Sequence, residues 1–377
     1  MAIKRCFAHK VSFFMGAKLW NPKMKFTTKD IVYVFVEMDS GEFGMGEVWS
    51  AYGSPETLVH IVNNDISPLI AGESPEDIEY LRKKVGGLAP IGSLSGLMMN
   101  ALSGVDIALW DLQGKLSGQP LCRLLGSYSE TVYTYASGGL YAKDKGLDEL
   151  AEEVRRYVDE GFDAVKMKIG GVSITADAER VRVVRETIGP DARLMVDSLH
   201  AYDVPQAMKM ADAIREHDIY WFESPVGFED MAGHGVINSS SGIHVCANET
   251  LSGISQFKHL MEHGGATYVH FDLSVCGGIT EAIKIAALAD SNGLKCTVHS
   301  ASGIGLFSSS IQFAASIPNC DSVEFHFVHR WLSEQKPEAM VHDGPSVKPL
   351  EEPGIGTAFI TPGFIEKTAK EELKKAD

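Results

Sequence analysis

Residues 194–197 read LMVD, a short apolar run that ends in an acid, and the same arrangement returns in residues 219–223 (IYWFE) and 245–249 (VCANE). Three further runs follow, at residues 268–272 (YVHFD), 296–299 (CTVH) and 322–324 (SVE). Successive last residues are 26, 26, 23, 27 and 25 positions apart, about one strand and one helix each: Asp197, Glu223, Glu249, Asp272, His299 and Glu324. In a parallel barrel the carboxyl ends of the strands meet at one rim, where active sites form. We therefore expect all six side chains to share one mouth.

Helical patterns separate these apolar runs. Apolar residues recur at helical spacing before Gly161 and again after Pro205, at Leu150, Val154, Tyr157 and Val158 and at Ala207, Met210, Ala211 and Ile214. Strands and helices that alternate this many times predict an α/β fold with a closed parallel barrel, over residues 131–330.

The first 130 residues have a different pattern. Residues 31–36 (IVYVFV) are apolar and β-branched, and residues 39–41 (DSG) are typical of a hairpin turn. The longest helical pattern runs roughly from Met98 to Leu116. We expect an α+β domain over residues 1–130, completed by a C-terminal segment, residues 331–377, that packs back on it.

The charge of the chain limits its partners. It has 34 Lys and Arg against 50 Asp and Glu, a net charge of −16. This balance argues against binding of nucleic acid or of an anionic membrane, and an anionic substrate would need a local cationic site. No apolar run approaches membrane-spanning length, and the six cysteines form no CxxC pair. We expect a cytoplasmic protein with reduced thiols.

Asp197, Glu223 and Glu249 end three successive strands of the expected barrel. Three carboxylates brought together cannot all stay ionised without a cation. They are hard oxygen ligands, with no thiol or imidazole partner among them, which favours Mg²⁺. A single acid at such a position is more often a helix cap or a surface charge, but three in register indicate a metal site.

Two lysines, Lys166 and Lys168, lie two positions apart in a strand-like run, so they face the same side of that strand. In a barrel strand that also contains Val165 and Ile169, that side faces the interior, where a lysine is rarely found unless its charge is paired or used. Neighbouring ammonium groups disfavour each other's charge, and we expect one lysine to have a lowered pKa and act as a base. Solvated lysines on an edge strand are the alternative.

His299 ends the strand that follows Asp272. An Asp272 carboxylate that accepts the Nδ1 proton would leave the Nε2 atom of His299 as an acid or base. A histidine considered alone is more often structural, and the preceding Asp272 favours the catalytic interpretation.

These residues resemble the mandelate racemase subgroup of the enolase superfamily, in the mandelate racemase/muconate lactonizing enzyme family. Residues 101–115 (ALSGVDIALWDLQGK), with Pro120-Leu121 and residues 124–126 (LLG), are similar to the family's signature helix, and residues 166–168 (KMK) to its KxK motif. The resemblance implies a modified TIM (β/α)7β barrel under an N-terminal α+β capping domain, and a Mg²⁺-dependent removal of the proton alpha to a carboxylate through an ene-diolate. By the same likeness the site residues are the ligands Asp197, Glu223 and Glu249 and the catalytic Lys166, Lys168, Asp272, His299 and Glu324.

The resemblance also implies capping loops at residues 13–28 and about 48–55 that close over the substrate. Their aromatic and basic residues are then candidates for substrate binding: Trp20, Lys23, Lys25, Trp49 and Tyr52. The chain departs from the family at Leu199, where an Asn usually contacts the substrate, and at Ser224 within the usual Glu-Glu-Pro run.

The same residues permit three reactions. In each, Lys166 and Mg²⁺ bind the substrate carboxylate, Lys168 or His299 takes the proton, and a protonated Glu324 donates a hydrogen bond. We favour loss of water from a sugar acid by a homo-oligomeric dehydratase, from a dimer to an octamer. Racemisation or epimerisation and lactone cycloisomerisation stay open. A binding scaffold is disfavoured by the inward lysines, and a two-metal hydrolase by the absence of several His ligands at the strand ends.

Overall fold

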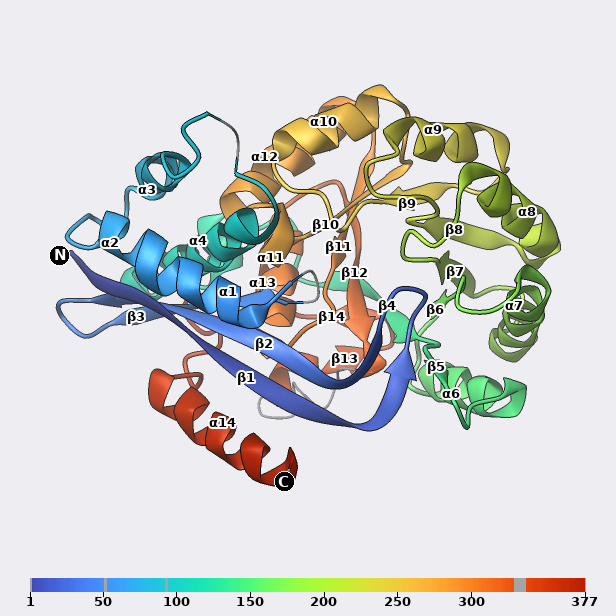
Figure 1. The fold of residues 1–377 in the computed structure, drawn as a ribbon, viewed down its shortest axis with the longest axis horizontal. Helices are drawn as coiled ribbons and strands as arrows, with labels where there is room; N and C mark the ends of the chain where they lie inside the picture. Colours follow the sequence, from blue (N-terminus) through green and yellow to red (C-terminus); the bar gives the residue numbers. More distant parts are fainter. Residues whose placement is uncertain (1, 51–52, 92–93, 329–336, 377) are drawn as a thin grey trace.

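The structure is a computed structural model that describes residues 2–50, 53–91, 94–328 and 337–376. Its two parts are a four-stranded sheet with helices on one face and a parallel barrel surrounded by helices (Figure 1). No helix among the described residues is long and apolar enough to cross a membrane.

The four-stranded sheet and its helices form what we term the cap. The sheet has the order β3-β2-β1-β5, from β1 (Ile3–Trp20), β2 (Lys25–Met38), β3 (Phe43–Trp49) and the short β5 (Tyr141–Ala142). Helices α1 (Pro55–His60), α2 (Ser67–Ile70), α3 (Ile78–Gly86), α4 (Gly96–Ser117) and α5 (Leu121–Leu124) follow β3, with a π-helical segment, Ile61–Ile66, between α1 and α2.

The turn between β2 and β3 has the sequence expected of it. Gly41 takes a φ of +99° there, and the Met38 N–H donates to the Glu42 carbonyl at 2.8 Å. Helix α4 confirms the longest helical pattern of the sequence, and it packs against β3 and β2.

The barrel confirms the expected α/β fold. Within the described residues, eight parallel strands follow in order around it: β4 (Val132–Gly138), β6 (Ala164–Lys168), β7 (Arg193–Asp197), β8 (Ile219–Glu223), β9 (Val245–Ala247), β10 (Tyr268–Asp272), β11 (Lys295–His299) and β12 (Cys320–His326). The sheet closes where β12 pairs in parallel with β4, Val323 opposite Thr134.

Helices cover the outside of the barrel between successive strands (Figure 1). They are α6 (Leu147–Asp159), α7 (Ile174–Ile188), α8 (Val204–Ile214), α9 (Met231–Ser240), α10 (Ile254–Glu262), α12 (Gly278–Ser291) and α13 (Ile304–Ala314), with the short α11 (Leu273–Cys276) after β10. Asp203 begins α8 through a capping box, since its carboxylate accepts from the Gln206 N–H at 2.8 Å and the Gln206 side chain accepts from the Asp203 N–H.

The C-terminal segment contacts both parts. Helix α14 (Pro362–Ala376) packs along β1, and the Glu372 carboxylate accepts a hydrogen bond from the Phe14 N–H. The short strands β13 (His342–Asp343) and β14 (Ser346–Val347) instead extend the barrel sheet, because β14 pairs with β4. The division into residues 1–130, 131–330 and 331–377 stays a prediction.

The expected loop over residues 13–28 is wrong. These residues form the distal ends of β1 and β2, which pair Leu19 with Phe26 and Trp20 with Lys25 beyond a shift in register between Phe14 and Leu19, and turn over residues 21–24. The Asn21 side chain accepts from the Lys23 and Met24 N–H groups, and this closes the turn. The Asn-Pro-Lys-Met sequence at residues 21–24 suits a turn, and the paired strands begin directly on either side of it.

We predict that Gly46→Ala destabilises the protein. A Cβ on Gly46 would lie 2.0 Å from the Gly104 carbonyl oxygen and 3.0 Å from the Ala108 nitrogen, so β3 and α4 would have to separate. Overpacking of this kind costs about 1–3 kcal/mol. Gly86→Ala in α3 is the control, since a Cβ there meets no atom within 4 Å. Urea unfolding should separate the two variants, and equal midpoints would contradict the packing argument.

Candidate active site

Both lysines of β6 point into the mouth of the barrel, as strand alternation requires. Lys166 is 1% exposed and Lys168 is 7% exposed. Lys166 Nζ lies 2.8 Å from Glu223 Oε1 and 3.0 Å from Glu324 Oε1, while Lys168 Nζ pairs with Asp197 Oδ2. The structure thus joins residues from β6, β7, β8 and β12 in one buried network.

The expected lowering of a lysine pKa is wrong for this arrangement. Burial disfavours the charge of Lys168, and so does Lys166, but the Asp197 carboxylate outweighs both and raises the pKa of Lys168 above its ordinary value. Burial likewise opposes the charge of Lys166, while Glu223 and Glu324 hold its pKa well above the usual range. The carboxylates on neighbouring strands therefore decide whether each lysine pKa is raised or lowered, and the sequence of β6 alone does not show them.

Asp197, Glu223 and Glu249 are fully buried at the ends of β7 and β8 and just after β9. The Leu199 N–H donates to Asp197 Oδ1 at 2.8 Å, and the Ser224 hydroxyl donates to Glu249 Oε2 at 2.6 Å. Burial and the Asp197 charge together raise the pKa of Glu223 well above its ordinary value. Crowded acids in a dry site behave in this way when no cation offsets them.

The atoms around these acids fit a divalent cation. Glu223, Glu249 and His270 each offer one ligand atom, and these atoms lie within 4.8 Å of one another; Asp197, which pairs with Lys168, is outside this group. Glu249 Oε1 and His270 Nε2 are buried, and neither has a hydrogen-bond partner among the described residues. Buried atoms of this kind need a partner such as an ion or water. The oxygen-rich set matches the preference of Mg²⁺.

His270 was not among the residues predicted from the sequence, and no imidazole was expected beside the acids. His270 lies on β10 two residues before Asp272, so strand alternation turns both side chains inward. Its Nε2 atom is 3.6 Å from Glu223 Oε1, and burial lowers its pKa to about 3, which keeps the ring neutral. The run YVHFD contained this signal, which alternation from Asp272 would have revealed.

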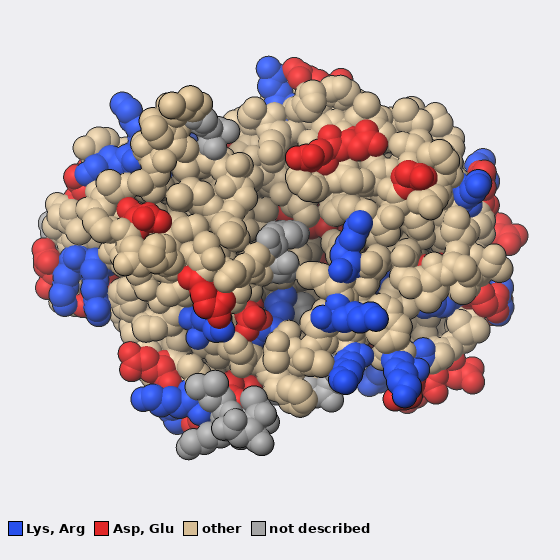
Figure 2. Space-filling view, viewed as in Figure 1, with Lys and Arg blue, Asp and Glu red and all other residues tan. Residues whose placement is uncertain are grey.

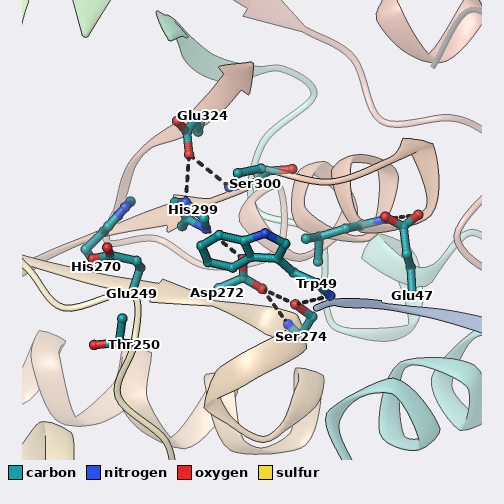
Figure 3. A network of polar contacts seen from close by, with 12 residues as sticks. Glu47, Trp49, Glu249, Thr250, His270, Asp272, Ser274, His299, Ser300 and Glu324 are labelled. Carbon is teal, nitrogen blue, oxygen red and sulfur yellow. Dashed lines mark hydrogen bonds and ion pairs between the residues drawn. The ribbon is translucent and has the colours of Figure 1, made fainter. Parts of the chain in front are cut away.

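Asp272 and His299 form a hydrogen-bonded pair that reaches the cap. His299 Nδ1 lies 2.7 Å from Asp272 Oδ2, and Asp272 Oδ1 accepts from the Ser274 hydroxyl at 2.6 Å (Figure 3). Ser274 Oγ in turn accepts from the Trp49 N–H at 3.1 Å, and the Trp49 ring lies against His299 with centroids 4.7 Å apart. Trp49, at the end of β3 in the cap, therefore packs against His299.

Glu324 lies on the other side of His299. Its Oε2 atom is 3.4 Å from His299 Nε2 and accepts from the Ser300 N–H at 3.2 Å (Figure 3). Burial would raise the pKa of Glu324, but Lys166 and His299 outweigh it and hold this pKa well below the ordinary value. The expectation of a protonated Glu324 is therefore wrong here, because two basic groups contact the carboxyl.

A cavity of about 150 Å³ joins the two candidate bases, Lys168 and His299. The cap supplies much of its lining: Asn21, Met24, Phe26, Thr28, Lys29, Asp30, Trp49 and Ser50. A second cavity of about 690 Å³ shares Met24, Trp49 and Leu199 with the first and is also lined by Lys23. The surface is hollowed between cap and barrel in Figure 2, and Lys and Arg side chains gather along one side of the hollow.

The substrate-binding candidates divide into two groups. Trp49, Leu199 and Lys23 line the cavities. Trp20 instead stacks on Tyr141, with ring centroids 5.9 Å apart, and Lys25 is exposed; neither lines either of these two cavities. Tyr52 lies outside the described residues.

Known proteins share this architecture along nearly the whole chain. Residues 149–361 match the model "Enolase C-terminal domain-like", and residues 15–126 match "Mandelate racemase / muconate lactonizing enzyme, N-terminal domain". An arabinonate dehydratase from Saccharolobus solfataricus is 31% identical over 90% of this chain and 91% of its own length. A 3,6-anhydro-alpha-L-galactonate cycloisomerase from Streptomyces coelicolor is 30% identical, covering 88% and 89%.

A solved structure agrees with the sequence matches. A racemase from Streptomyces coelicolor, solved with bound magnesium, superimposes with a TM-score of 0.85 at 26% identity, over 94% of this chain and 96% of that one. By name, the curated relatives include dehydratases, cycloisomerases and an epimerase. The chain therefore belongs to the mandelate racemase/muconate lactonizing enzyme family of the enolase superfamily.

Proposed function

We propose that the protein removes the proton alpha to the carboxylate of a sugar acid, with Mg²⁺, and completes the reaction by loss of water. The observation that carries this proposal is the cavity shared by Lys168 and His299. The two residues come from β6 and β11, which are not neighbours in the sheet, so a substrate between them meets two proton-transfer groups from different directions.

Asp197, Glu223 and Glu249 would hold the ion, with His270 beside them. When bound, Mg²⁺ offsets the charge of these acids and stabilises negative charge on a substrate oxygen. Lys166 adds a fixed ammonium next to them, since Glu223 and Glu324 hold it in place at 2.8 and 3.0 Å. Preorganised positive charge of this kind favours the ene-diolate over the starting acid.

The proton steps fall to Lys168 and His299. Asp197 raises the pKa of Lys168 while the two groups are paired, and an ion bound to Asp197 would compete for that carboxylate. Lys168 would then take the α-proton onto Nζ as the free amine. His299 gives a proton from Nε2 to the β-hydroxyl, the C–O bond breaks and water leaves, and Asp272 holds the Nδ1 side of the ring throughout. Glu324 orients both Lys166 and His299 through its two oxygens.

Cycloisomerisation is the second candidate. The cycloisomerase relative matches this chain at 30% identity and the dehydratase relative at 31%, so the matches do not separate the two reactions. Epimerisation needs the same two groups, with His299 returning a proton to the α-carbon. Dehydration is preferred because several of the relatives are named as dehydratases of sugar acids.

We predict that Lys168→Met and His299→Asn each lower dehydration by about 10²–10⁴-fold, the usual share of general acid–base catalysis. The two variants should differ in D₂O. Lys168→Met loses exchange of the α-proton, whereas His299→Asn keeps exchange and loses release of water. NMR of a panel of pentonic, hexonic and hexaric acids with Mg²⁺ measures both.

Lys258→Met is the matched control, because Lys258 is 65% exposed on α10 outside the barrel. It should keep the wild-type rates. Wild-type turnover in both Lys168→Met and His299→Asn would disprove the assignment of the two proton-transfer groups.

We predict that Mg²⁺ stabilises the protein through the same three acids. A ligand at 100 times its dissociation constant adds about 2.7 kcal/mol to the free energy of unfolding, so Mg²⁺ should raise Tm and EDTA should lower it. Glu249→Gln should abolish this rise, and Glu262→Gln, at an exposed carboxylate of α10, should retain it. An equal rise in both variants would mean that the ion binds elsewhere.

A further inference from the structure

Lys29 lies on the face of β2 that points toward the barrel. Its neighbours on that face, Ile31, Tyr33 and Phe35, are buried in the large core cluster shared with the barrel, whereas Val32 and Val34 pack under the cap helices. Strand alternation therefore carries the Lys29 side chain to the barrel mouth. There it lines the 150 Å³ cavity together with Lys168 and His299.

The Lys29 side chain is half-buried, and its ammonium has no ion-pair partner among the described residues. Nζ donates to the Ala301 carbonyl at 2.6 Å and lies 5.2 Å from the centre of the Trp49 ring. Among the described residues, no carboxylate lies within salt-bridge distance of it. Burial lowers the pKa of Lys29 to about 7, even though Glu47, Asp272, Glu324 and Asp30 act in the opposite direction from farther away.

An anion in this cavity would satisfy Lys29. A buried charge is costly unless it is paired, and a carboxylate is the partner that an ammonium prefers. Of the acids that act on Lys29, Asp272 is engaged by Ser274 and His299, and Glu324 by Lys166 and Ser300. Glu47 accepts from backbone N–H groups, and Asp30 lines the cavity but forms no ion pair with Lys29. The remaining partner has to arrive with the ligand.

We propose that Lys29 binds a second acidic group of the substrate, so that the preferred substrate is a dicarboxylic sugar acid. This inference rests on the proposed function, which places the first carboxylate beside Lys166 and the metal ligands. The second carboxylate would then lie on the cap side, in the 150 Å³ cavity that Lys29 lines with Lys168 and His299. A primary hydroxyl at that end would leave the ammonium unpaired, and this difference selects the diacid.

Lys23 does not offer the same recognition. It lines the larger neighbouring cavity, but its side chain is exposed. An exposed ammonium keeps its water, and its pairing with a carboxylate contributes little. The selective group is therefore Lys29, which is half-buried, whereas Lys23 is exposed.

Calorimetric titration at pH 7 with Mg²⁺ tests the proposal, on pairs of ligands that differ only at C6: galactarate and galactonate, glucarate and gluconate, mannarate and mannonate. The wild type should bind at least one diacid about 10²-fold more tightly than its monoacid partner. Lys29→Met should remove that preference and leave monoacid affinity within about threefold, and Lys29→Arg should keep part of it.

Lys295→Met is the matched control, because Lys295 is exposed at the start of β11, the opposite end of the strand that carries His299. It should bind like the wild type. A wild type that binds diacids and monoacids with equal affinity would overturn the proposal. So would a Lys29→Met variant that keeps the diacid preference, or one whose affinities for diacid and monoacid fall by the same factor.

Binding and proton exchange separate this inference from the proposed function. If diacids bind through Lys29 but no acid of the panel exchanges its α-proton, the proposed function fails and the role of Lys29 stands. If exchange proceeds and Lys29→Met discriminates like the wild type, Lys29 is not the recognition group and the proposed function stands.

Discussion

The charges at the barrel mouth are enclosed together away from water, and the rest of the site depends on how they balance. Lys166 and Lys168 enter from β6, and acids enter from β7, β8 and β12. Each group would be unstable there alone, because burial opposes every charge. Together they set one another's protonation, so that Glu223 has a raised pKa while Glu324 has a lowered one. The remaining excess of carboxylates is what a divalent cation offsets.

The strand-end residues could be predicted from sequence because the barrel repeats. A period of about one strand and one helix identified Asp197, Glu223, Glu249, Asp272 and His299, and the register of β6 to β8 places Lys168, Asp197 and Glu223 at one level. Protonation could not be predicted in the same way. The pKa of Lys168 depends on Asp197 across a strand pair, and that of Glu324 depends on Lys166, two strands away around the closed sheet.

The cap was predicted less well, for a physical reason. The loop over residues 13–28 was expected only from the resemblance, whereas pairing between β1 and β2 keeps the ends of this segment extended. Lys29 was missed because its importance comes from docking: the strand face that carries Ile31 and Tyr33 is covered by the barrel, and the sequence alone does not say what covers a strand. His270, by contrast, could have been found by alternation from Asp272.

Closure of the barrel pairs Thr134 with Val323, two residues that are distant in the sequence. The cap also contacts a distant segment, because Glu47 accepts hydrogen bonds from the Gly303 and Gly305 N–H groups. Contacts this distant in sequence form slowly, because the intervening chain must first be ordered. During synthesis, a ribosome-bound chain that has not yet exposed β12 has neither a closed sheet nor Glu324 beside Lys166. Until the last strand arrives, Lys166 therefore lacks one of the two carboxylates that hold it.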